Sequence, residues 1–222
     1  MNKVITLIVA LGALVAGVLL FDKLSTNPPA EFALHYQQAR EVKPFSLTDH
    51  HGETFNNASL KGYWSWMFFG YTSCPDVCPT TLQEMNFVYD YFKAIAKNSQ
   101  VILVSVDPNR DTQEKLASYI GYFNPEFKAV RGDHSALFPF ARNLGLMYAI
   151  TEEESSTDVT GSAGPKKPAN YLVDHSASLV LINPEGNIEA IFKPEQILGQ
   201  VPSIEGDKLV SDFAKIVGLY KG

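Results

Sequence analysis

The sequence predicts an α/β domain, a mixed sheet flanked by helices, that follows an N-terminal transmembrane helix. Three observations predict this arrangement. Residues 4–21 carry no charge, and apolar segments typical of buried strands alternate with segments of helical periodicity between residues 63 and 150. Two further apolar segments near the C-terminus are separated by a Pro-Glu-Gly turn, which indicates a hairpin. Strands that alternate with helices imply a sheet covered on both faces.

The N-terminal segment, residues 1–24, is predicted to be an uncleaved membrane anchor. As a helix, its uncharged run of 18 residues would span about 27 Å, close to the roughly 30 Å hydrocarbon core of a bilayer. A cleaved signal peptide is the alternative, but the run exceeds the usual apolar region of about 7–15 residues and no small-residue cleavage site ends it. Lys3 favours an N-terminus inside the cell. We therefore expect a single-pass protein of the bacterial inner membrane with its domain in the periplasm.

Residues 25–41 are predicted to be a linker, because Asn27, Pro28 and Pro29 give it a linker composition. Residues 42–222 then form one domain, which is large enough for a single core. The chain has 18 basic and 24 acidic residues, a net charge of −6 and no basic run, so nucleic acid is not an expected partner. Its two cysteines exclude both a disulfide-dense small protein and a zinc site of four cysteines.

The elements of the domain follow in order from the sequence pattern. We expect a hairpin over residues 45–55, a buried strand over 63–69, a helix that starts near Pro79, a strand over 101–106, a helix capped by Asp111, a strand over 127–130, a helix between Asp133 and Gly145, a strand over 147–150, a polar loop over 151–169, a hairpin over 178–192 and a helix over 205–220. This order, three alternations of strand and helix followed by two strands and a helix, predicts a thioredoxin-like architecture.

Cys74 and Cys78 lie four residues apart where the buried strand leads into a helix. Positions i and i+4 share one face of a helix, so the two sulfurs can pair with each other or bind one metal. The positive end of the helix dipole stabilises a thiolate, the form that attacks disulfides and binds metals. The pair is therefore a candidate metal site or a candidate catalytic dithiol. A purely structural disulfide would contribute little, because it would close a very short loop.

The chain has five histidines, and His175 is the candidate third ligand. It lies between the long polar loop and a predicted central strand, so it can reach the end of the sheet where the cysteines lie. His35 is placed near the linker, His50 and His51 at a solvated hairpin tip, and His134 on the surface at the start of a helix. Two thiolates and one imidazole suit Cu(I) and, through the nitrogen, Cu(II). Zinc with a fourth ligand stays open as an alternative.

The chain resembles the Sco/SenC family of copper chaperones for cytochrome c oxidase assembly. The resemblance rests on four segments in order: FSLTDHHGETF, FFGYTSCPDVCPTTLQEM, LVSVDPNRDTQEKLASYI and YLVDHSASLVLINPEG. It implies a thioredoxin fold in which Cys74, Cys78 and His175 bind copper, and it places Asp107 near the metal. The chain departs from the family in the tract of residues 62–66, where relatives carry Gly-Lys, and in its long loop of residues 151–168.

The resemblance implies a membrane-anchored, extracytoplasmic metallochaperone that helps to assemble the binuclear copper centre of the oxidase. Its expected partners are the copper-site subunit of the oxidase, another copper carrier, a thioredoxin-like reductant and, through the N-terminal helix, the membrane. The alternative function is thiol-disulfide oxidoreductase, with Cys74 as the attacking and Cys78 as the resolving cysteine. Peroxide reduction and redox sensing are lesser alternatives.

Overall fold

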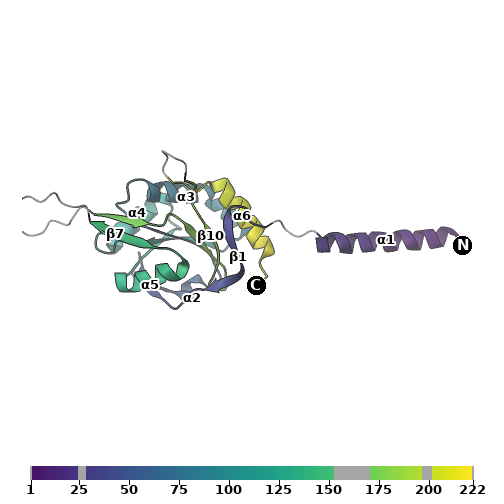
Figure 1. The fold of residues 1–222 in the computed structure, drawn as a ribbon, viewed down its shortest axis with the longest axis horizontal. Coiled ribbons are helices and arrows are strands. Elements are labelled where there is room, and N and C mark those ends of the chain that lie inside the picture. The colour runs from purple at the N-terminus through teal and green to yellow at the C-terminus, as the bar shows by residue number, and fades with distance from the viewer. Residues whose placement is uncertain (1, 25–28, 153–170, 197–201, 222) are drawn as a thin grey trace, which may run out of the picture.

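The computed structural model describes residues 2–24, 29–152, 171–196 and 202–221 (Figure 1). Its main sheet has eight strands, which lie in the order β1 (Ala33–Glu41), β10 (Asn187–Phe192), β9 (Leu179–Ile182), β4 (Trp64–Gly70), β5 (Ser99–Ser105), β6 (Lys128–Arg131), β2 (Ser46–Asp49) and β3 (Thr54–Asn56). Strands β4, β5 and β6 are parallel, and every other pairing is antiparallel. The predicted mixed sheet is confirmed.

The central strands β4 and β5 carry the apolar segments from which they were predicted. Every residue of both strands is buried, as expected for parallel strands covered on both faces. They pair in register from Trp64 opposite Ser99 to Gly70 opposite Ser105. The chain therefore leaves β4 at Gly70, on the side of the sheet where the carboxyl ends of the parallel strands lie. The cysteine segment follows directly after Gly70.

Helices cover the two faces of the sheet unequally (Figure 1). On one face, α3 (Val77–Ile95), α4 (Gln113–Phe123) and α6 (Gly206–Leu219) contribute to one hydrophobic cluster with Trp66. The Trp66 ring centroid lies 4.4 Å from that of Phe92 in α3 and 5.2 Å from that of Phe213 in α6. The other face is covered by α5 (His134–Leu144), by the short α2 (Asn57–Leu60) and by the buried side chains Tyr148 and Val173. The core thus forms two layers, one on each side of the sheet.

A second, two-stranded sheet consists of β7 (Tyr148–Glu152) and β8 (Tyr171–His175). The strands are antiparallel, and Tyr148 lies opposite His175. The strand expected over residues 147–150 is confirmed, whereas β8 was not expected. Most of the polar loop predicted for residues 151–169 lies outside the described residues, and residues 151 and 152 belong to β7.

The segment predicted to be a linker contains β1, which joins the edge of the main sheet. Leu34 of β1 lies opposite Ile191 of β10. The carboxylate of Asp212 in α6 accepts hydrogen bonds from the backbone N–H groups of Phe32 (2.6 Å) and Ala33 (2.8 Å), which fixes the entry to this strand. Residues 33–41 are therefore part of the folded domain, because strand pairing and a buried carboxylate hold them there.

The prediction that Asp111 caps α4 is wrong. The cap is Thr112, whose side-chain oxygen accepts a hydrogen bond from the Lys115 backbone N–H at 3.2 Å. Asp111 is fully buried and accepts hydrogen bonds from the hydroxyls of Thr72 (2.5 Å) and Ser105 (2.7 Å). It therefore fastens the cysteine segment to the end of β5.

The N-terminal residues form the helix α1 (Asn2–Leu24), drawn apart from the sheet in Figure 1. The predicted transmembrane helix is not confirmed. Within the described part of the chain, no helix combines the length and the apolar character that crossing a bilayer requires.

Candidate metal centre

The two cysteines lie where β4 leads into α3. Cys74 is partly buried in the connecting loop, and Cys78 is fully buried in the first turn of the helix. A Cβ atom at Gly70 would lie 2.7 Å from Cys78 Sγ, which is closer than atoms can pack. The glycine at the end of β4 therefore provides the space that the Cys78 sulfur occupies.

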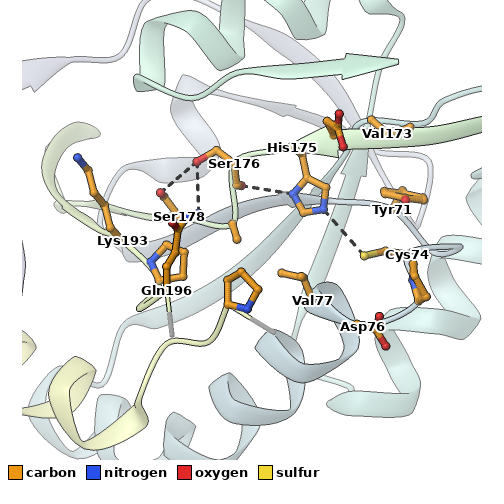
Figure 2. Close-up of a pocket in the computed structure, with 15 residues that line it drawn as sticks. Tyr71, Cys74, Asp76, Val77, Val173, His175, Ser176, Ser178, Lys193 and Gln196 are labelled. Carbon is orange, nitrogen blue, oxygen red and sulfur yellow. Dashed lines mark hydrogen bonds between the residues drawn. The ribbon is translucent and has the colours of Figure 1, made fainter. Parts of the chain in front are cut away.

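His175, the last residue of β8, brings its imidazole to both sulfurs. Its Nε2 lies 3.4 Å from Cys78 Sγ and 4.0 Å from Cys74 Sγ, and Figure 2 shows the ring directed at Cys74. The other ring nitrogen, Nδ1, lies 3.3 Å from the Ser176 carbonyl oxygen. A proton on Nδ1, shared in a hydrogen bond with this carbonyl, leaves the Nε2 lone pair free to bind a metal, whereas a proton on Nε2 can be donated to the Cys74 thiolate of the metal-free pair.

The three candidate ligands form one compact donor set. Their ligand atoms all lie within 4.8 Å of one another, and the described residues contain no other such group of three. Two sulfurs and one imidazole nitrogen are soft donors, which fits copper better than a hard cation such as magnesium or calcium. The residues that the sequence proposed as ligands are therefore close enough to hold one ion.

The two cysteines differ in their protonation. The pKa of Cys74 is lowered to about 4, mainly because the Cys78 thiol donates a hydrogen bond to the Cys74 thiolate. Hydrogen bonds from His175 and from the backbone N–H groups of Asp76 and Cys78 lower it further, whereas burial acts in the opposite direction. The pKa of Cys78 is raised, because its thiol proton is held by Cys74, its side chain is buried and the Cys74 thiolate repels a second negative charge. Cys74 is thus the thiolate and Cys78 the thiol of the metal-free pair, and both cysteines are free.

Asp107, which the resemblance placed near the metal, does not belong to the donor set. Its carboxylate is almost fully buried and accepts hydrogen bonds from the Arg110 guanidinium and from the Tyr171 hydroxyl. The Arg110 guanidinium also lies over the Tyr171 ring, 3.8 Å from its centroid. Asp107 therefore reaches His175 only indirectly, through Tyr171 on the same strand, β8, and through Arg110, whose guanidinium also lies near the Tyr71 ring.

The remaining histidines have other partners. His50, predicted to be solvated, is buried, because the end of its hairpin packs on β6 and its Nδ1 accepts the Ala129 N–H at 3.2 Å. The His51 ring packs against that of His50, with centroids 4.0 Å apart and the ring planes tilted by 40°. Two further contacts complete the set: His35 Nε2 lies 3.0 Å from Glu189 Oε1, and His134 Nδ1 lies 2.9 Å from the Tyr148 hydroxyl.

An open cavity of about 730 Å³ lies beside the centre (Figure 2). Cys74 and His175 line it, together with Asp76, Ser176, Ser178 and Lys193. Cys78 does not line the cavity. A partner that enters from this side therefore meets the Cys74 sulfur and the imidazole before it can reach the second sulfur.

The positions of Arg110, Tyr71 and Tyr171 around the centre were not expected. The Tyr71 ring meets the His175 ring edge-on, with centroids 5.9 Å apart. The available sequence signals were the spacing of Asp107 and Arg110, three residues apart, and the position of Tyr171 in the same apolar segment as His175. Neither signal says that the two segments meet in space.

A sheet of this topology, with two cysteines at a strand-to-helix junction and a histidine facing them, defines a thioredoxin-like protein with three soft donors that could hold one metal ion. The sequence profile of the SCO1/SenC family matches residues 34–201, which is most of the chain. The chain belongs to the SCO1/SenC family.

Two relatives support this assignment, and a third structure shares the fold. A SCO2-like protein of Rickettsia prowazekii is 30% identical over 192 residues, which cover 84% of this chain and 88% of that protein. The structure of Arabidopsis thaliana ScoI with copper bound is 29% identical, with a TM-score of 0.67, and the match covers 81% of this chain and 99% of the other. The structure of BsSco, described as a member of the Sco family of cytochrome c oxidase assembly proteins, is 20% identical and shares the fold, with a TM-score of 0.55 over 84% of this chain and 99% of that one.

Proposed function

We propose that this protein binds one copper ion through Cys74 Sγ, Cys78 Sγ and His175 Nε2 and delivers it to the copper-site subunit of cytochrome c oxidase. The observation that carries the proposal is the donor set itself, three soft ligand atoms within 4.8 Å of one another at the rim of an open cavity. A relative of 29% identity holds copper, and the Sco family is tied to assembly of the oxidase. Both facts support copper as the cargo.

Delivery by ligand exchange fits the unequal exposure of the two sulfurs. A thiol of the partner enters through the cavity and meets Cys74, which is partly exposed, while Cys78 stays fully buried beneath it. Each partner thiol that binds copper gives up its proton. On release Cys78 takes up one proton, whereas Cys74 stays a thiolate and the remaining proton passes to solvent. No oxidation state changes, so the transfer needs no oxidant or reductant. The buried sulfur is then the last to release the ion.

We place this reaction in the extracytoplasmic space, in association with the membrane. Two neighbouring thiols can be oxidised there, which would block metal binding, so the proposal includes a thioredoxin-like reductant that restores the dithiol. It also includes an upstream copper carrier. Fractionation of cells that express the full chain tests the location.

The proposal is tested by metal analysis of the full chain and of three variants, Cys74→Ala, Cys78→Ala and His175→Ala. Wild type is expected to retain one copper per chain after gel filtration. Each variant is expected to bind copper at least about tenfold more weakly, because the loss of about 1.4 kcal/mol of binding free energy with one ligand corresponds to that factor. Unchanged copper binding in all three variants would contradict the proposal.

A second candidate function is thiol-disulfide exchange, favoured by the low pKa of Cys74 beside a protonated Cys78. The Cys74 thiolate attacks a partner disulfide, forms a mixed disulfide and releases one partner thiolate. Cys78 then loses its proton and attacks the Cys74 sulfur, which leaves an oxidised pair in this chain and a reduced pair in the partner. His175 does not react in either exchange step, so a His175→Ala variant that keeps reductase activity but binds copper more weakly separates the two functions.

A further inference from the structure

The strand that carries His175 is not a strand of the main sheet. Among the described strands, β8 forms hydrogen-bonded pairs with β7 alone, and β7 with β8 alone. The ligand imidazole therefore does not inherit its position from the rigid sheet that positions the cysteines. Contacts of individual side chains must hold β8 in place.

One group of such contacts lies at the start of β8. Tyr171, four residues before His175, donates its hydroxyl hydrogen to Asp107 Oδ1. The Arg110 guanidinium lies 3.8 Å from the centroid of the Tyr171 ring, and its Nε donates to Asp107 Oδ2. Asp107 is 1% exposed and its backbone N–H donates to the Ser105 hydroxyl at the end of β5, so this cluster is anchored in the body of the domain.

The same arginine extends toward the imidazole. Its guanidinium carbon lies 5.6 Å from the centroid of the Tyr71 ring, and that ring meets His175 edge-on with centroids 5.9 Å apart. Tyr71 is 3% exposed and directly follows β4, so it belongs to the fixed part of the site. Arg110 thus lies between two aromatic rings, Tyr171 on the strand of His175 and Tyr71 on the cysteine side.

We propose that Arg110 and Tyr171 are positioning residues that, with Asp107 as their anchor, latch β8 against the domain and set how readily His175 leaves the two sulfurs. Neither residue belongs to the donor set. Hydrogen bonds to a charged carboxylate and contacts between a guanidinium and an aromatic ring are stronger than their neutral counterparts. A few of them can therefore hold β8 in place without the continuous strand pairing of the main sheet. The inference rests on the proposed function, because it assigns to the latch control over the release of copper.

The latch is tested first without copper, on the full chain. Tyr171→Phe removes the hydroxyl and keeps the ring, and Arg110→Lys keeps the charge and loses the planar group. The readout is hydrogen exchange of the Val173 and Ser176 amides; the Ser176 N–H donates to the Met147 carbonyl at 3.0 Å. Loss of one hydrogen bond to a charged group is expected to speed their exchange about tenfold. The matched control is Tyr122→Phe, at a position that is 85% exposed on α4, which is expected to leave exchange unchanged.

The latch is tested next with copper bound. We expect Tyr171→Phe and Arg110→Lys to bind one copper per chain, as wild type does, but to lose Cu(I) to an excess of chelator about tenfold faster, in line with the same lost contact. The Cu(II) forms are expected to keep their thiolate absorbance while the imidazole nitrogen signal in their electron paramagnetic resonance spectra weakens. A purely structural role would not change that nitrogen signal selectively.

The outcomes separate this inference from the proposed function. If wild type binds copper with His175 and both latch variants match it in amide exchange and in copper release, the latch is overturned and the proposed function stands. If wild type shows no copper binding that depends on His175, the proposed function fails, and amide exchange in the metal-free chain still decides whether the latch exists. An increase in exchange shared by the amides of β4 and β5 would show general destabilisation and would also overturn the latch.

Discussion

His175 Nε2 lies 3.4 Å from Cys78 Sγ, although 97 positions of sequence separate the two residues. The contact joins the small β7–β8 sheet to the first turn of α3 and completes the donor set. Cys78 is held by the main fold, whereas His175 is held by side-chain contacts. The copper site that we propose therefore combines a fixed half with a half that can be displaced.

Gly70→Ala is expected to disturb the fixed half. The new Cβ would lie 2.7 Å from Cys78 Sγ and 3.1 Å from Leu103 Cδ1, so the sulfur must move. Overpacking of this kind typically costs about 1–3 kcal/mol of unfolding free energy. Because the Cys78 sulfur is displaced, we expect copper affinity to fall about tenfold. This factor corresponds to a loss of about 1.4 kcal/mol of binding free energy.

The matched control is Gly121→Ala in α4, where an added Cβ meets no atom within 4 Å. This change is expected to stabilise the helix by about 0.5–1 kcal/mol and to leave copper binding unchanged. Denaturant unfolding and copper titration of both variants check the prediction. Wild-type affinity in Gly70→Ala would show that Cys78 does not need its present position.

The reactivity of Cys74 is expected to persist at acidic pH. Its pKa is lowered to about 4, so the thiolate is present above that value and is lost as the pH falls through it. Ultraviolet absorbance of the thiolate and alkylation by iodoacetamide measure this directly in the metal-free chain. A Cys78→Ala variant, which removes the hydrogen bond that the Cys78 thiol donates to Cys74, should titrate at higher pH. A wild-type midpoint near the ordinary cysteine value of about 8.5 would contradict the assignment.

Asp212→Asn is expected to loosen β1 from the domain. Burial favours a raised pKa for this carboxyl, but the N–H donors of Glu31, Phe32 and Ala33, with Lys215, outweigh burial and lower the pKa. The carboxylate therefore stabilises the fold above the pKa of the unfolded chain, about 3.9, and this contribution is lost as the pH falls through the lower folded value. At neutral pH the variant should lose about 2 kcal/mol of unfolding free energy.

Asp207→Asn, an exposed change in the first turn of the same helix, is the control and should cost less than about 1 kcal/mol. Chemical denaturation of both variants at neutral and acidic pH makes the measurement. The difference between wild type and Asp212→Asn should shrink as the pH is lowered below about 4, close to the unfolded carboxyl value. A difference that does not depend on pH would show that the carboxylate charge is not responsible.

The sequence predicted those parts of the molecule that have a local cause. The segment of β4 is apolar because both its faces are buried, so it can be recognised without its partners. The cysteine pair is recognisable from its short spacing at a strand-to-helix junction. The expected shared helix face is wrong, because α3 begins at Val77 and Cys74 lies in the loop before it. Gly145, which ends α5 with a positive φ of 80°, was also expected, because this backbone conformation favours glycine.

The features that escaped prediction depend on contacts between distant segments. The strand β1 lies at the edge of the sheet and has no alternating apolar pattern in its sequence. It can be recognised only from its pairing with β10 in the structure. The burial of His50 follows from the packing of its hairpin on β6. The Tyr171 hydroxyl and Asp107 are 64 positions apart. Local propensity contains no information on such a contact.

The most direct test of the copper site compares wild type with His175→Ala after each full chain is loaded with one equivalent of Cu(II). Electron paramagnetic resonance then reports the atoms bound to the metal. We predict sulfur and nitrogen ligation in wild type and loss of the imidazole nitrogen, with retained sulfur ligation, in the variant. The same nitrogen signal in both proteins would contradict the site proposed here, because it would place another residue on the metal.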